Sequence, residues 1–194
     1  MFHKKLTKNE INELPLRAFK GNINIVDSKE KSKKACVSLI NETTLGFDTE
    51  TRPAFRKGEH YLPSVLQLAG EETVYIFQII KTGLTPDLIN ILSNKKIIKC
   101  GVAINYDLIE LNKVAPFIPG GFIDLGELAK KSNIPHHGLR GLTACLLNFR
   151  ISKSAQTTNW ETKQLTQKQI TYAATDAWVG RKLYLDYFKN RTKI

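Results

Sequence analysis

The order of strand-like and helix-like segments limits this chain to few folds. Three segments rich in β-branched and aromatic residues follow one another early, and later ones alternate with segments of helical period. The strand-like segments are residues 22–26, 43–50, 64–69, 73–80, 96–102 and 123–124. Helices are expected at residues 29–40, 86–92, 105–113, 125–131, 138–148 and 167–189. This order predicts an α/β fold, with a mixed sheet covered by helices.

No repeat, low-complexity tract or linker divides the sequence. Residues 1–194 are therefore expected to form one domain, with a core at about 14–188. The three cysteines are scattered among apolar residues, which predicts reduced, buried thiols. No apolar run approaches the roughly 20 residues of a membrane span, and the N-terminus lacks the apolar region of a secretory signal. By default, these features predict a cytoplasmic protein with no membrane partner.

Basic residues are in excess. Lysine and arginine number 29 against 18 acidic residues, which gives a formal net charge of +11 at pH 7. Each phosphate that Lys or Arg neutralises releases condensed counterions, so the excess favours a polyanionic partner such as nucleic acid. The charge alone does not distinguish an enzyme that acts on nucleic acid from a module that only binds it.

Two acidic residues close the buried strand expected at residues 43–50. Asp48 and Glu50 are two positions apart, so the side-chain period of a strand places both on one face. Adjacent carboxylates repel, and burial pushes one toward protonation unless a cation lies beside them. A divalent metal ion uses both as oxygen ligands. The pattern alone leaves a solvated strand end as the alternative.

Two further acids lie in helical segments. Asp107 falls in the first turn of the helix expected at residues 105–113, where an acid can also simply stabilise the helix dipole. Asp176 follows Tyr172 by four positions in the last helix, so both side chains lie on one helical face. An interior Asp is unfavourable to a helix, and it indicates either a functional site or an ion pair with a nearby basic residue.

The combined pattern resembles the DEDDy branch of the DnaQ-like 3′–5′ exonucleases, which includes ribonuclease D and the Werner syndrome exonuclease domain. The similarity covers most of the chain, from about residue 14 to residue 187, and residues 159–177 are especially similar to the Werner-type group. The matching segments are Phe47-Asp48-Thr49-Glu50 with Arg52-Pro53, Leu66-Gln67-Leu68-Ala69, residues 101–111, residues 139–147, Lys153-Ser154, Asn159-Trp160, Leu165-Thr166 with Gln169, and residues 172–177.

The resemblance implies a ribonuclease H-like fold, with a five-stranded mixed sheet and helices on both faces. It implies that Asp48, Glu50 and Asp176 hold the metal ion that binds the attacking water. Asp48 would also bridge to a second ion, and Asp107 would complete that side. Two ions can stabilise the nucleophile and the leaving 3′-oxygen of an in-line displacement. Mg²⁺ or Mn²⁺ fits an all-carboxylate site better than Zn²⁺.

Tyr172 is expected to position the attacking water. Because the unperturbed pKa of tyrosine is about 10, it acts as the base only where nearby cations lower that pKa. The related DEDDh branch has a histidine five residues before the last acid, where this chain has Thr171. His136 and His137 lie outside the motif and are interpreted as ordinary loop residues.

Other residues are expected to bind substrate by the same similarity. Trp160 stacks on a base or sugar, or else anchors the core. Lys153 contacts a phosphate or is merely solvated, and Leu66 packs near the terminal nucleotide or in the core. Thr49 and Asn105 complete the predicted set.

The sequence therefore predicts a 3′–5′ exonuclease that releases nucleoside 5′-monophosphates from single-stranded or recessed 3′ ends. The Werner-type resemblance favours DNA and a role in repair. Ribonuclease D-like processing of RNA 3′ ends is the alternative. A nucleic-acid-binding module without catalysis is a second alternative, which the complete set of acids disfavours.

Overall fold

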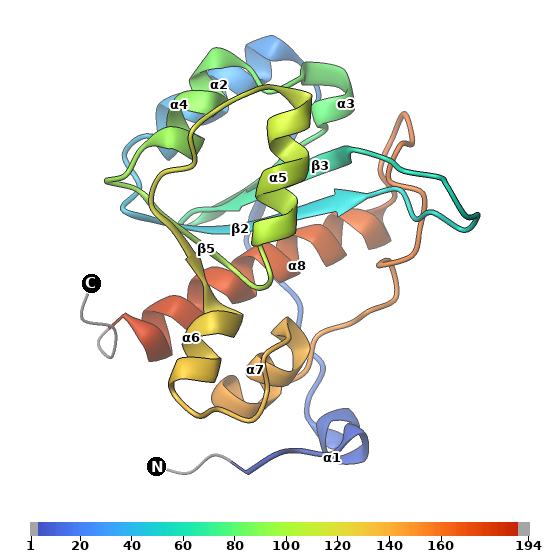
Figure 1. Ribbon diagram of the computed structural model, residues 1–194, viewed down its shortest axis with the longest axis vertical. Helices are drawn as coiled ribbons and strands as arrows, with labels where there is room; N and C mark the ends of the chain where they lie inside the picture. The colour runs from blue at the N-terminus through green and yellow to red at the C-terminus, as the bar shows by residue number, and fades with distance from the viewer. Residues whose placement is uncertain (1–3, 190–194) are drawn as a thin grey trace.

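A computed structural model describes residues 4–189, in which six strands form one sheet in the order β1-β4-β3-β2-β5-β6 (Figure 1). The strands are β1 (Asn22–Val26), β2 (Thr44–Thr51), β3 (Pro63–Ala69), β4 (Thr73–Phe77), β5 (Ile98–Gly101) and β6 (Phe122–Asp124). β2 is antiparallel to β3, and β3 to β4, whereas β1, β5 and β6 join by parallel pairing. The mixed sheet predicted from the sequence is confirmed.

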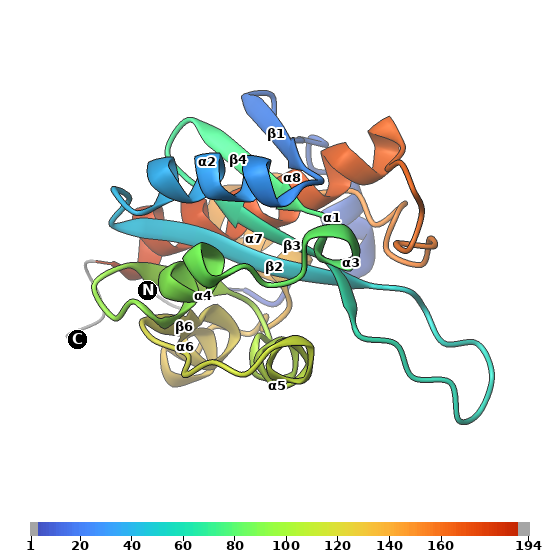
Figure 2. The same ribbon diagram turned by 90° about the horizontal axis from the view of Figure 1, so that it is seen from above.

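The sheet has one strand more than the resemblance implies. The sixth strand is β6, which is only three residues long and pairs with β5 at the edge of the sheet. Its residues match the short strand expected at 123–124. The segment between β2 and β3, residues 52–62, contains no regular element, as Pro53 and Gly58 indicate, and it extends away from the rest of the molecule in Figure 2.

Helices cover both faces of the sheet. In Figure 1, α5 lies in front of the sheet and α8 behind it. α2, α4 and α5 share one apolar core with Phe47 and Leu45 of β2, while α8 packs on the opposite face. The helices are α1 (Lys8–Glu13), α2 (Lys29–Leu39), α3 (Ile79–Thr82), α4 (Pro86–Ser93), α5 (Asn105–Val114), α6 (Leu125–Lys131), α7 (Leu139–Leu147) and α8 (Gln167–Leu183).

Three segments differ from the sequence expectations. α1 was not predicted, although Thr7 and Glu10 form a capping box that starts it. β4 ends at Phe77 rather than continuing to residue 80, because Ile79–Thr82 turns away as the short helix α3. α8 ends at Leu183, and the chain continues as a π-helix over Tyr184–Phe188.

β2 and α8 are in direct backbone contact at one point. A Cβ added to Gly46 would lie 1.8 Å from the carbonyl oxygen of Ala177, so only glycine allows this approach. α8 begins at its own capping box, in which Thr166 and Gln169 bond reciprocally. The close approach brings the middle of α8 against β2 two positions before Asp48.

Two of the three cysteines are buried, as expected. Cys36 and Cys100 are buried, Cys145 is half-buried, and all three are free thiols. No described helix combines the length and apolar character that crossing a lipid bilayer requires.

Candidate active site

The site begins with the alternation of side chains along β2. Phe47 points into the core that β2 shares with α5, and Gly46 faces α8. Asp48 and Glu50 therefore lie on the α8 face, as the period-2 pattern predicts. Glu50 is only 8% exposed, and Asp48 is half-buried.

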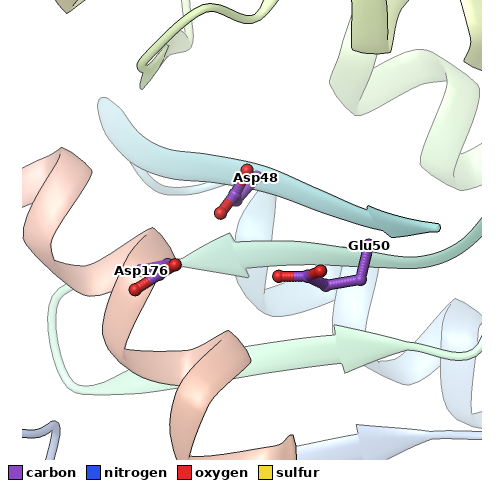
Figure 3. Close-up of side chains that lie close together, drawn as sticks. All are labelled: Asp48, Glu50 and Asp176. Atoms are coloured by element: carbon purple, nitrogen blue, oxygen red, sulfur yellow. The ribbon is translucent and has the colours of Figure 1, made fainter. Parts of the chain in front are cut away.

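α8 brings the third acid to this face. Asp176 is 7% exposed, and in Figure 3 its carboxylate lies close to those of Asp48 and Glu50. One carboxylate oxygen from each of the three residues lies within 4.8 Å of the others. Residues 128 positions apart in sequence thus form one cluster, from Asp48 to Asp176.

Burial makes it energetically unfavourable for all three carboxylates to be charged when no cation is bound. Burial, followed by the charges of Asp48 and Asp176, raises the pKa of Glu50 to about 10. Burial also raises the pKa of Asp48 well above its usual value, with Asp176 and Asp107 adding to the effect. The pKa of Asp176 rises to about 7 through burial, partly offset by a hydrogen bond from Tyr172 and the charge of Lys153.

A divalent cation matches what this cluster lacks. The Oδ1 atom of Asp176 is buried and has no hydrogen-bond partner. Three carboxylates supply hard oxygen ligands, the type that Mg²⁺ and Mn²⁺ prefer, and a cation offsets their mutual repulsion. The chemistry and burial of Asp48, Glu50 and Asp176 therefore fit a divalent metal ion.

Asp107 lies beside this cluster but outside its closest group. It projects from the first turn of α5 and accepts a hydrogen bond from the Thr49 hydroxyl. Burial raises the pKa of Asp107, and the Thr49 hydrogen bond opposes that rise. Because its charge raises the pKa values of both Asp48 and Glu50, Asp107 belongs to the same electrostatic site.

Tyr172 stands one helical turn before Asp176, as its spacing predicts. It is 8% exposed, and its ring packs against that of Trp160 with 6.1 Å between ring centroids. Burial and the negative charges of Asp176 and Glu50 raise the pKa of Tyr172 above its usual value. The phenol therefore keeps its proton beside these carboxyl groups, and it is able to donate a hydrogen bond.

A cleft of about 730 Å³ opens over the acids. Asp48, Thr49, Glu50, Tyr172 and Asp176 line it from β2 and α8. The opposite wall comes from α1, from α7 and from the segments just before and just after α7, and its polar side chains are Lys8, His136, Arg140, Ser152, Lys153 and Gln156. The cleft thus has an acidic wall and a wall that carries basic side chains.

The expected substrate-binding residues take three kinds of position. Thr49 and Lys153 line the cleft, and Lys153 is exposed. Trp160 and Leu66 are fully buried, in agreement with the core roles left open for them. Asn105 is exposed at the start of α5.

Lys8 and Arg140 were not predicted as residues of the cleft, and His136, which was expected to be an ordinary loop residue, also lines it. The capping box of Thr7 and Glu10 could have indicated α1, and therefore an ordered position for Lys8. Arg140 belongs to a segment that had already been expected to be helical, but nothing in its spacing indicates which way it points. Its place depends on the packing of α1 against α7.

Comparisons with known proteins point to one family. The family model described as 3′–5′ exonuclease matches residues 23–191. The bifunctional 3′–5′ exonuclease/ATP-dependent helicase WRN of Mus musculus is 31% identical over 181 residues, covering 88% of this chain and 13% of the mouse protein. Ribonuclease D of Haemophilus influenzae is 28% identical over 155 residues, covering 78% of this chain and 38% of that protein. The chain thus spans less than half the length of these curated relatives.

The fold also matches solved structures. The Nibbler EXO domain of Aedes aegypti superposes with a TM-score of 0.79 at 23% sequence identity, covering 89% of this chain and 91% of that one. This likeness confirms the ribonuclease H-like α/β fold that the sequence predicts.

Proposed function

Because this chain belongs to the 3′–5′ exonuclease family, we propose that it is a metal-dependent enzyme that removes nucleoside 5′-monophosphates from nucleic-acid 3′ ends. The observation that carries the proposal is the convergence of Asp48, Glu50 and Asp176. Three acids with raised pKa values at the floor of a cleft are unfavourable without a cation, and they are suited to binding one.

The four acids are divided between two metal-ion positions in the proposed site. Asp48, Glu50 and Asp176 hold one divalent ion, Mg²⁺ or Mn²⁺. Asp48 is shared with a second ion, and Asp107 completes that side directly or through water. When bound, such a pair of ions supplies an activated water and stabilises the leaving 3′-oxygen of the displaced chain.

Tyr172 positions the water. In the metal-free site its pKa is raised beside Asp176 and Glu50, so the phenol keeps its proton there and orients a neighbour through a hydrogen bond; it would act as the base only where bound cations lower that pKa. Lys153 lines the same cleft close enough to Asp176 to lower its pKa. The lysine charge suits a phosphate oxygen of the bond to be broken. Thr49 supports the site through its bond to Asp107.

The remaining expected substrate residues lie at other positions around the site. Asn105 is exposed at the start of α5, two positions before Asp107, where a bound nucleotide could reach it. Trp160 and Leu66 are buried, and they support the site through packing, Trp160 against Tyr172. We retain residues 1–194 as one exonuclease domain.

Cleavage of labelled oligonucleotides tests the proposal. Wild-type protein with Mg²⁺ or Mn²⁺ is expected to shorten a 5′-labelled strand stepwise and to release the label from a 3′-labelled strand as a mononucleotide. EDTA, Asp48→Asn and Asp176→Asn should each abolish both signals. The matched control is Asp87→Asn, because Asp87 is exposed on α4, which packs on the other face of the sheet.

Either of two results refutes the exonuclease proposal. One is a wild type that binds nucleic acid tightly but cleaves nothing in either metal ion. That result favours the alternative of a catalytically silent binding module. The other is an Asp176→Asn variant as active as the wild type.

We propose DNA as the preferred polymer, with a role in repair, and RNA 3′ processing as the alternative. The similarity of residues 159–177 to the Werner-type group supports DNA, and the relative named ribonuclease D supports RNA. The net charge of +11 suits both polymers. Initial rates on matched single-stranded DNA, recessed duplex DNA and RNA distinguish them, and a faster rate on RNA refutes the DNA preference.

A further inference from the structure

The wall opposite the acids is formed by two helices that hold each other in place. α1 and α7 lie close together in Figure 1, and Arg140 of α7 donates a hydrogen bond to Asn12 of α1. The backbone N–H of Leu6 donates to His136 Nε2 at 2.9 Å, just before α7 begins. These contacts fix the N-terminal segment, so Lys8 has a defined position on the cleft wall.

Arg140 has donor capacity that the protein does not use. It lines the cleft, and its Nε atom is buried with no hydrogen-bond partner. Within residues 4–189 it forms no salt bridge, and Asn12 is its one hydrogen-bond acceptor. A buried charged donor without a partner is unfavourable, so this guanidinium is suited to a ligand that brings acceptor oxygens.

Lys8 adds a second free cation to the same wall. It is exposed, and it makes no ion pair with any residue in the described part of the chain. Glu10, two positions away on α1, is already engaged. Its carboxylate lies 2.6 Å from Lys4 Nζ and 2.7 Å from the backbone N of Thr7, which donates to it. The charge of Lys8 therefore remains available to an anion in the cleft.

The first turn of α7 adds to this positive character. Its N-cap is Gly138, which offers no side-chain acceptor, and its first turn contains no acidic residue. The helix dipole and the N–H groups of the first turn therefore attract an anion, as the Arg140 guanidinium does. The acids are held by β2 and α8, whereas Arg140 and Lys8 come from α7 and α1, so different elements carry the two charge types.

We infer that Arg140 and Lys8 form a phosphate-binding site for the nucleic-acid chain, separate from the carboxylate cluster. The inference rests on the proposed function, because it takes the scissile phosphate to lie at Asp48, Glu50 and Asp176. That phosphate is the last one before the 3′ end. Every other phosphate of the chain lies on its 5′ side, so the Arg140 site holds a phosphate of the retained strand.

Binding without catalysis tests this site first. Arg140→Gln and Lys8→Gln are titrated with a fluorescent single-stranded oligonucleotide in EDTA. Each variant is expected to bind about tenfold more weakly, as loss of a hydrogen bond to a charged group implies. The slope of log affinity against log salt should fall by about 0.7 for each lost phosphate contact. Lys33→Gln is the control, because Lys33 is an exposed lysine of α2 outside the cleft and should leave both quantities unchanged.

Substrates with a defined number of phosphates locate the contact. A dinucleoside monophosphate contains only the scissile phosphate, whereas the same compound with a 5′-phosphate, or a trinucleoside diphosphate, contains one more. The Arg140→Gln variant is expected to cleave the dinucleoside monophosphate at the wild-type rate. On the two compounds with an additional phosphate, it should show a raised KM with little change in kcat. An equal loss on all three compounds would overturn the assignment.

A structural role for Arg140 has a separate signature. Asn12→Ala removes the contact between α1 and α7 but keeps the Arg140 charge, so affinity should stay near that of the wild type. Arg140→Lys keeps the charge without the planar fork and should restore part of the affinity. If Asn12→Ala weakens binding as much as Arg140→Gln, the arginine is only an anchor and the inference is wrong. Thermal unfolding of each variant checks that the fold is retained.

The two proposals fail in different ways. If the wild type binds the oligonucleotide through Arg140 but cleaves nothing in Mg²⁺ or Mn²⁺, the exonuclease function is refuted and the phosphate site stands. If the wild type cleaves and Arg140→Gln binds as tightly as it does, the phosphate site is refuted and the exonuclease function stands.

Discussion

The carbonyl oxygen of Ala177 occupies the space that a side chain on Gly46 would need. A Cβ at Gly46 would lie 1.8 Å from that oxygen, far inside van der Waals contact. Because Gly46 precedes Asp48 by two positions and Ala177 follows Asp176, this contact aligns β2 with α8 where the acids meet. The geometry of the carboxylate cluster therefore depends on a position that carries no side chain.

Gly46→Ala is predicted to destabilise the fold and weaken metal binding together. Pushing α8 away from β2 should lower the free energy of unfolding by about 1–3 kcal/mol or more, as overpacking does. Urea unfolding measures the first effect, and the increase in melting temperature on adding Mn²⁺ measures the second. Gly138→Ala is the control, since a Cβ there meets nothing within 4 Å. Equal stabilities of the two variants would contradict the prediction.

Thr49→Val is predicted to remove the bond that fixes Asp107 while keeping the shape of the side chain. Thr49 is 9% exposed, and its hydroxyl donates to the Asp107 carboxylate. Loss of a hydrogen bond to a charged group should lower the free energy of unfolding by about 1.5–3 kcal/mol.

Thr49→Ser retains the hydroxyl and should recover most of this stability. Denaturant unfolding of both variants in EDTA makes the comparison without a metal contribution. If Thr49→Val and Thr49→Ser are equally stable, the hydrogen bond contributes nothing to the folded state.

The sequence predicted the parts of this site that depend on local periodicity. The two-residue spacing of Asp48 and Glu50 fixes their common face on any strand, and the four-residue spacing of Tyr172 and Asp176 does the same on any helix. The meeting of the two pairs depends on the approach of Gly46 to Ala177, a contact between distant segments that has no local pattern. The prediction that the two pairs meet therefore came from the resemblance to a family and not from the spacing of the residues.

Other features depend on tertiary packing and could not be read from the sequence. α1 has only six residues, and the contacts with α7 hold it in place. Its capping box alone is a weak sequence signal for a helix. Trp160 was open to a role in base stacking or in the core, and only the folded chain reveals its full burial. Lys99 reads as an ordinary charged residue in a strand, but it is fully buried.

Lys99→Met is predicted to be strongly destabilising despite its larger apolar surface. The ammonium group donates to the carbonyl oxygens of Ile91 at 3.1 Å, Asn94 at 2.7 Å and Ile97 at 2.8 Å. Methionine removes the ammonium donor from all three oxygens, of which those of Ile91 and Asn94 each keep only a backbone N–H donor at 3.3 Å, and this should lower the free energy of unfolding by about 3 kcal/mol. Lys96→Met, at an exposed position nearby, is the control for urea unfolding. A loss no greater than that of Lys96→Met would show that the three bonds are not needed.

Stability in EDTA is predicted to fall as the pH rises, and divalent ions should reverse the fall. The pKa of Glu50 rises from 4.5 to about 10 on folding, and that of Asp176 from 3.8 to about 7. Below the lower value of each pair both states hold the proton. Between the two values only the unfolded state releases the proton, so the folded state loses up to about 1.4 kcal/mol per pH unit for each retained proton; above the upper value both states have released it and the loss stops growing.

Melting temperatures with EDTA and with Mg²⁺ at pH 5.5 and pH 8 measure this effect. Since a cation binds the deprotonated carboxylates, the stabilisation by Mg²⁺ should be larger at pH 8. In Glu50→Gln the dependence on pH should be weaker. A stabilisation by Mg²⁺ that is the same at both pH values would contradict the proposed metal site.

Tyr172→Phe is predicted to slow cleavage without weakening the binding of substrate. The phenol ring keeps its packing against Trp160, so only the hydroxyl near Asp176 is lost. If that hydroxyl positions the attacking water, kcat should fall by about 10²-fold or more while KM stays near the wild-type value. Single-turnover cleavage of a 5′-labelled oligonucleotide in Mg²⁺ measures the chemical step. A raised KM with unchanged kcat would instead assign the hydroxyl to substrate binding, since an interaction equally strong in the bound substrate and in the transition state alters KM alone.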